Sequence, residues 1–110
     1  MNEDKTARIR ELNDTFRTSG LGGKFVLTTG VGSLGVDMVG KIIEAVKAFD
    51  AFTPDNDPYG EHDFGSLEVE SNRVFWKIDY YDKDLIHGSN DASNADVTSR
   101  VLTIMLREEY

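Results

Sequence analysis

The fold is decided by residues 52–84, FTPDNDPYGEHDFGSLEVESNRVFWKIDYYDKD, in which a polar loop precedes a predicted β-hairpin. This stretch holds the only tryptophan and three of the four tyrosines of the chain. Pairing Leu67 with Trp76 and Val69 with Val74 across a Ser71-Asn72 turn places four apolar side chains on one face. The other face then carries Glu68, Glu70, Arg73, Phe75, Lys77 and Asp79. The alternation predicts a sheet that buries one face.

Two stretches have the periodicity of amphipathic helices. The first spans 4–18, where an apolar stripe leaves the arginines mostly solvated; the stripe is Ile9, Leu12 and Phe16, and the arginines are Arg8, Arg10 and Arg17. The second spans about 37–49, with Val39, Ile42, Ile43, Val46 and Phe49 facing inward. Both helices are therefore expected to pack on the apolar face of the sheet.

Two further stretches complete the predicted sheet. Residues 24–29, KFVLTT, are rich in β-branched and aromatic residues and predict a strand. Near the C-terminus, a helix capped by Asp96 competes with a strand over 99–106, and the alternation of Val101, Thr103 and Met105 favours the strand. The fold class is α+β, with two helices on a largely antiparallel sheet of about four strands and the 64–70 and 73–81 hairpin at its centre. One domain spans 1–110.

Composition limits the function classes. The chain contains no cysteine, which removes disulfides, thiolate metal sites and cysteine nucleophiles. Its charged N-terminus and the absence of a long apolar run predict neither a signal peptide nor a membrane span, so a cytoplasmic location is expected. No cofactor is indicated by any motif.

The net charge of −8 is concentrated in one half of the chain, since residues 50–96 carry twelve acidic and three basic side chains. An acidic surface of this kind argues against direct binding of nucleic acid or anionic membranes. It fits a protein partner with a basic surface, although charge runs are commonly just solvated.

A glycine pattern follows the first predicted strand, in GVGSLG at 30–35. Strand, G-x-G-x-x-G and helix is the order of a dinucleotide-binding turn, and Asp50 follows Gly30 by twenty residues. The fingerprint also needs a second parallel strand before its acidic residue, whereas Asp50 directly follows the helix. Tight turning and close packing are sufficient reasons for these glycines.

The loop at 53–63 allows two kinds of chemistry. Its oxygen ligands match part of a calcium-loop template, but Ser66 stands where a bidentate carboxylate is needed. The alternative metal ligands are Asp55, Asp57, Glu61 and Asp63. His62, flanked by Glu61 and Asp63, is the alternative catalytic group as a general base, although a histidine that fixes a turn by hydrogen bonds is the commoner case.

Three motifs carry a family resemblance: TPDNDPYGEHDFGS at 53–66, which includes NDPYGEHDFG, VFWKIDYYDKDL at 74–85, which includes FWKIDYYD, and RVLTIML at 100–106. The chain resembles, from IRELND at 9–14 onward, an uncharacterised family of small bacterial proteins. That family is a domain of unknown function, often encoded on plasmids and other mobile elements. The resemblance implies no catalytic or binding residues. It implies that the chain is encoded on mobile elements, which also encode small acidic proteins that block host defence nucleases.

Two functions are therefore weighed. The first is a non-enzymatic protein-binding module, in its narrowest form a mobile-element inhibitor of a host nucleic-acid-binding defence complex of the anti-CRISPR or anti-restriction type. Its expected contacts are Asp55, Asp57, Glu61, Asp63, Glu68, Glu70, Asp79, Tyr81, Asp82 and Asp84. The second is a metal-assisted or acid–base enzyme centred on the 55–63 loop. A partner that is another copy of the chain is a third, structural alternative.

Overall fold

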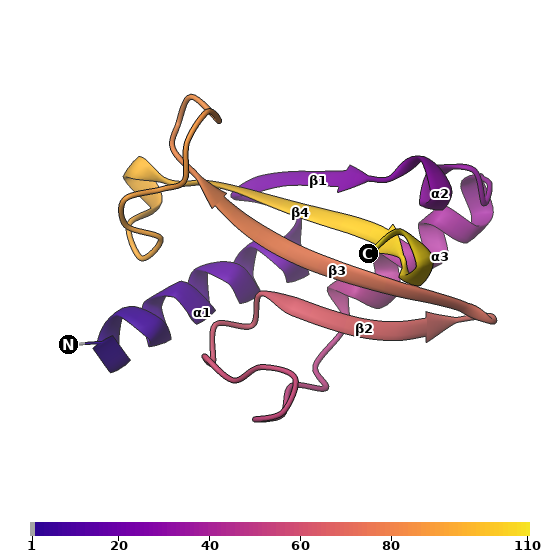
Figure 1. The fold of residues 1–110 in the computed structure, drawn as a ribbon, viewed down its shortest axis with the longest axis horizontal. Coiled ribbons are helices and arrows are strands. Elements are labelled where there is room, and N and C mark those ends of the chain that lie inside the picture. The colour runs from indigo at the N-terminus through magenta and orange to yellow at the C-terminus, as the bar shows by residue number, and fades with distance from the viewer. Residues whose placement is uncertain (1) are drawn as a thin grey trace.

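The computed structural model describes the backbone of residues 2–110 and the side chains of residues 4–110. Its α+β architecture confirms the predicted class (Figure 1). The four strands form one sheet in the order β1-β4-β3-β2, in which β1 and β4 are parallel and the other neighbours antiparallel. The elements are α1 (Asn2–Ser19), β1 (Gly23–Leu27), α2 (Thr29–Gly32), α3 (Val36–Lys47), β2 (Phe64–Val69), β3 (Asn72–Tyr81), η1 (Ala95–Val97), β4 (Ser99–Leu106) and η2 (Arg107–Glu109).

The hairpin has the predicted faces but not the predicted register. Val74 lies opposite Leu67, and Trp76 lies opposite Gly65, so the pairing is shifted by two residues. The turn consists of Glu70 and Ser71, which have φ angles of 46° and 74° and thus satisfy a tight two-residue turn with two left-handed positions. A shift of two keeps each side chain on its own face, because the side-chain period of a strand is two.

The core lies between the sheet and the helices α1 and α3. Phe16 of α1 and Ile42 and Val46 of α3 pack with the inward residues of β3 and β4, among which Trp76 is fully buried. The strand expected at 99–106 is confirmed, since β4 has these bounds. The expectation that Arg17 is solvated is wrong: only 3% of it is exposed.

On the opposite face of the sheet, an aromatic cluster covers one end. The ring of Tyr110, which follows η2, lies 5.0 Å from that of Phe75 and 5.7 Å from that of Phe64. These contacts place Tyr110 against side chains of β2 and β3, and in Figure 1 the end marked C lies beside β3 and β4. Among the described residues, no helix is long and apolar enough to cross a membrane.

Candidate functional site

The loop that follows α3 is fixed to one polar stripe of α1. Arg10 donates to the carbonyl oxygen of Gly60 at 2.8 Å, and Asn13 donates to that of Glu61 at 3.0 Å. Residues 10, 13, 14 and 17 share a helix face because they are spaced by three or four positions. The loop therefore takes its position from α1, and its site residues come to lie between that helix and the sheet.

His62 is held from several sides. Its Nδ1 lies 2.9 Å from Oδ1 of Asp14, and its Nε2 lies 3.6 Å from Oδ2 of Asp57. Its ring stacks on Phe52 with 3.7 Å between centroids and 3° between planes. The backbone of His62 adopts a left-handed φ of 55°, and its amide donates to Asp57 at 3.2 Å.

This arrangement explains His62 as the clamp of a turn. Asp14 lies within hydrogen-bond distance of Nδ1 and Asp57 lies 3.6 Å from Nε2, so each ring nitrogen has a carboxylate beside it. The side chain of Asp57 is only 7% exposed, which means that it needs the imidazole as a partner. A general base requires a free nitrogen within hydrogen-bond reach of the substrate. The geometry thus favours the turn-fixing role over the catalytic alternative.

A second polar network lies beside the clamp and crosses the core. Asn13 donates to the hydroxyl of Tyr80 at 2.8 Å, and this hydroxyl donates to Glu61 at 2.7 Å. Asn13 in turn accepts from Nε of Arg100 at 2.7 Å. Burial raises the pKa of Tyr80, and its hydrogen bond to Glu61 raises that pKa further. Through the hydrogen bond from Tyr80, Glu61 therefore holds β3 against the loop.

Arg17 is a third buried polar group at this junction. It donates to the carbonyl oxygens of Val46 and Lys47 at 2.9 and 3.1 Å, and so caps the C-terminal end of α3. Its guanidinium lies 5.2 Å from the centroid of Trp76. Burial lowers the pKa of Arg17, and Asp14 acts in the opposite direction. Arg17 ties both helices to the aromatic core.

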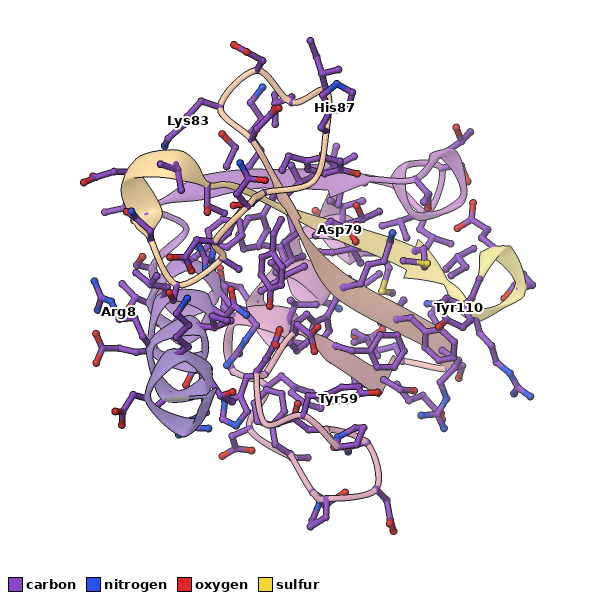
Figure 2. All side chains as sticks on the ribbon, turned by 60° about the vertical axis from the view of Figure 1, so that its left-hand side comes forward. Arg8, Tyr59, Asp79, Lys83, His87 and Tyr110 are labelled. Atoms are coloured by element: carbon purple, nitrogen blue, oxygen red, sulfur yellow. The ribbon has the colours of Figure 1, made fainter. Side chains whose placement is uncertain are left out.

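Asp63 has a different environment from the other carboxylates of the loop. In the described chain it has no ion-pair partner within 4.0 Å. Burial raises the pKa of Asp63, and repulsion from three neighbouring carboxylates raises it further; these are Glu61, Asp57 and Asp79. We call Asp57, Glu61, Asp63 and Asp79 the acidic cluster. Figure 2 shows Asp79 on β3 between the loop that carries Tyr59 and the loop that carries Lys83 and His87.

The remaining expected contact residues are distributed over separate parts of the surface. Glu68 and Glu70 lie at the hairpin tip, where they pair with Arg73 and Lys41. Asp82 accepts from the amide of Ile86, which lowers the pKa of Asp82, and Tyr81 is half-buried. Asp55 and Asp84 are exposed. The carboxylates listed from the sequence therefore do not form one continuous surface. Those of the acidic cluster are related by their effect on the pKa of Asp63, and Asp79 among them pairs with Lys77 at 2.7 Å.

The calcium-loop alternative requires convergent oxygen ligands. Asp57 faces His62, whereas Glu61 faces Tyr80. Within residues 4–110, no group of three or more His, Cys, Asp or Glu side chains is placed to hold a metal ion. The four alternative ligands thus remain neighbours in sequence without forming a coordination shell.

The carboxylate of Glu109 lies against the glycine turn at 30–35. Glu109 accepts from the hydroxyl of Thr28 at 2.6 Å and from the amide of Gly30 at 3.0 Å. A Cβ atom at Gly30 would lie 2.6 Å from this carboxylate, so a larger residue there would displace the end of the Glu109 side chain. The position where a dinucleotide phosphate would bind is occupied by Glu109, which the sequence pattern did not identify.

Asn13, Arg17 and Arg100 are site residues that the sequence reasoning missed. Asn13 and Arg17 are four positions apart on α1, and each is at most 3% exposed. Arg100 alternates with Leu102 and Ile104 on the buried face of β4. That alternation was the available signal, because a charged residue in an apolar register indicates a buried polar network.

The comparisons identify the chain at the level of a family. The model of the family described as "Protein of unknown function (DUF3768)" matches residues 27–109. The chain belongs to this family. The DUF3768 match includes the loop, the hairpin and β4, and therefore most residues of the site apart from those on α1. A comparison with curated proteins and one with solved structures found no match.

Proposed function

We propose that this DUF3768 protein is a non-enzymatic module that binds a protein partner with a basic surface, and that the acidic cluster is the centre of contact. The observation that supports this proposal is the environment of Asp63, which is half-buried among like charges without a cation of its own. Like charges held together in a fold repel one another at a cost that a cationic partner removes. The negative potential of the acidic cluster would therefore favour binding of a cationic partner.

The surroundings of the acidic cluster also suit a protein contact. Tyr59, in the same loop as Asp57 and Glu61, is 80% exposed between Pro58 and Gly60. Exposed tyrosine offers a rigid contact area with a polar tip, and such residues are enriched at interfaces. The clamp at His62 and the bond from Arg10 hold this loop in place, so little order would have to be gained on binding.

The narrower form of the proposal concerns the kind of partner. A positive groove that normally holds phosphates presents the charge complementary to the acidic cluster. A host nucleic-acid-binding defence complex has such a groove, and the resemblance to proteins of mobile elements supports an inhibitor of this type. Occupying the groove would block nucleic acid without any catalytic step.

The test is an affinity capture from a bacterial lysate with a charge-reversed variant. Asp63→Lys with Asp79→Lys changes the cluster while leaving Asp57 and Glu61 to hold His62 and Tyr80. Glu68→Lys with Glu70→Lys is the matched control, since it makes the same change of charge at the hairpin tip. Buried Trp76 reports by its fluorescence that each variant is folded.

The expected result is a protein that the wild type and the control retain, that the cluster variant loses, and that salt releases. Retention by the cluster variant at every salt concentration would contradict the proposal. An empty wild-type lane would contradict it as well. Light scattering of the purified chain tests the alternative in which the partner is a second copy.

A further inference from the structure

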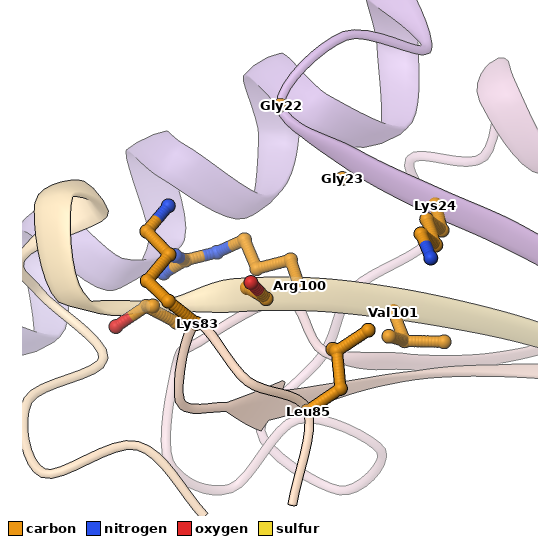
Figure 3. A pocket seen from close by; sticks show the side chains of 9 residues that line it. Gly22, Gly23, Lys24, Lys83, Leu85, Arg100 and Val101 are labelled. Atoms are coloured by element: carbon orange, nitrogen blue, oxygen red, sulfur yellow. The ribbon is translucent and has the colours of Figure 1, made fainter.

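Two adjoining cavities lie on the other side of α1 from the His62 clamp, near the start of β1 and β4. Their volumes are about 290 and 460 Å³. Gly22, Lys83, Thr98 and Arg100 line both of them, so the two form one recess, which we call the Arg100 pocket. In Figure 3, Lys83 and Arg100 extend toward one end of the smaller cavity, while Leu85 and Val101 lie toward the other.

Arg100 is a buried cation with neutral hydrogen-bond partners. It is 3% exposed, and it donates from Nε to Asn13 and from Nη2 to the carbonyl oxygen of Ala92. No carboxylate lies within 4.0 Å of its guanidinium in the described residues; the guanidinium lies 5.2 Å from the centroid of the Tyr80 ring, and Glu61 acts on it only from a longer distance. A buried charge is costly unless it is paired.

One nitrogen of Arg100 remains available. Nη1 donates to no acceptor in the described part of the chain, and it is not among the side-chain atoms that are sealed from solvent without a partner. A guanidinium presents its donors in a rigid fork that suits carboxylate and phosphate oxygens. Arg100 lines the pocket, and Nη1 is its one nitrogen without an acceptor, so it could donate to an oxyanion bound there.

The charge around the pocket is positive in a protein that is acidic overall. Arg8 and Lys83 line the larger cavity together with Arg100, and Glu11, which pairs with Arg8, is the only acidic residue in that lining. The lining of the smaller cavity contains no acidic residue. Burial lowers the pKa of Arg100 and repulsion from Arg8 adds to this effect, whereas Tyr80 and Glu61 raise that pKa. Lys83 makes no ion pair with any described residue.

We propose that the Arg100 pocket binds a small organic oxyanion. The phosphate or carboxylate group lies against Nη1 of Arg100 and the ammonium of Lys83, and the apolar part of the ligand lies against Leu85 and Val101. Leu85 is 41% exposed in the free protein, so its side chain is open to such a contact. The ligand would supply the negative charge that the protein does not give to Arg100.

The test is a titration of the ¹⁵N-labelled protein with three probes, which are inorganic phosphate, phenyl phosphate and hexanoate. The expected result is a saturable shift of the Gly22 and Thr98 amides, with phenyl phosphate binding more tightly than inorganic phosphate. Lys83→Ala should weaken binding at least tenfold. Lys41→Ala, which removes an exposed lysine of α3 that pairs with Glu70 of the hairpin, should leave binding unchanged.

The probes also distinguish the two sources of the oxyanion. Binding of phenyl phosphate alone would indicate a phosphate ester, and binding of hexanoate would indicate a carboxylate. Arg100→Lys should abolish binding if it folds, which Trp76 fluorescence reports; if it does not fold, Lys83→Ala decides. The proposal is overturned if no probe gives a saturable shift, or if Lys83→Ala binds as tightly as the wild type.

Discussion

Nδ1 of His62 lies 2.9 Å from Oδ1 of Asp14, although the two residues are 48 positions apart in the chain. This contact joins the loop before β2 to the middle of α1. The loop also carries Asp57, Glu61 and Asp63, so the position of the acidic cluster depends on the same contact. The role of His62 is consequently tested by stability and not by turnover.

Replacing His62 with alanine should lower the free energy of unfolding by about 2 to 3 kcal/mol. The substitution removes the stack on Phe52 and leaves Asp57, only 7% exposed, without the imidazole beside it. Urea unfolding followed by Trp76 fluorescence measures the loss. His87→Ala is the control, because His87 is exposed and its loss should change stability by less than about 0.5 kcal/mol. Equal stabilities of the two variants would rule out the clamp.

The sequence predicted the faces of the hairpin but not its register. Alternation decides which side chains point inward, and a shift of two leaves that pattern unchanged. What sets the register is the room that Gly65 leaves for the indole of Trp76 and the two left-handed residues of the turn. Neither contribution is contained in hydrophobic periodicity, since one is a contact across strands and the other a backbone angle.

The candidate site was predictable only in part for a similar reason. Its loop could be located from composition, with His62 and the neighbouring carboxylates as candidates. Partners of that loop come from α1, where Asn13 and Asp14 contact it, and Asn13 is itself held by Arg100 of β4. Long-range hydrogen bonds of this kind leave no local signal beyond a polar residue in an apolar register.

Alanine substitutions at two glycines should have opposite effects on stability. A Cβ atom at Gly65 would lie 2.3 Å from Nε1 of Trp76, so Gly65→Ala should destabilise the fold by about 1 to 3 kcal/mol. Gly40 lies within α3 with nothing within 4 Å of its Cβ position, so Gly40→Ala should stabilise it by about 1 kcal/mol. Thermal unfolding of both variants gives the comparison. A neutral Gly65→Ala would contradict the observed pairing with Trp76.

At neutral pH, the wild type should be less stable than the Asp63→Asn variant. Its folded pKa is raised above the unfolded value, so ionisation is penalised in the folded state at a pH above the folded pKa. Asp63→Asn should therefore stabilise the fold at pH 7 by about 0.5 kcal/mol, since solvent screens a half-buried carboxylate. This advantage should disappear as the pH falls through the folded pKa towards 3.8. Denaturant midpoints at pH 7 and pH 3 measure it.

The matched control for that measurement is Asp55→Asn, an exposed carboxylate of the same loop. It should give equal midpoints to the wild type at both pH values. A loss of stability in Asp63→Asn at pH 7 would show that Asp63 is compensated within the fold, and the main support for the proposed basic partner would then be lost.

Glu109 should have the opposite pH dependence, because its pKa is lowered. The hydrogen bond from Thr28 is the largest cause, and those from the amides of Leu106 and Gly30 add to it. A carboxylate with a lowered folded pKa stabilises the fold above its unfolded pKa and loses that contribution as the pH falls through the folded pKa. Glu109→Gln should thus lower the Tm at pH 7 and have a much smaller effect well below pH 4.5. A pH-independent difference in Tm would mean that Glu109 contributes through packing alone, and that hydrogen bonds in the glycine turn do not stabilise its negative charge.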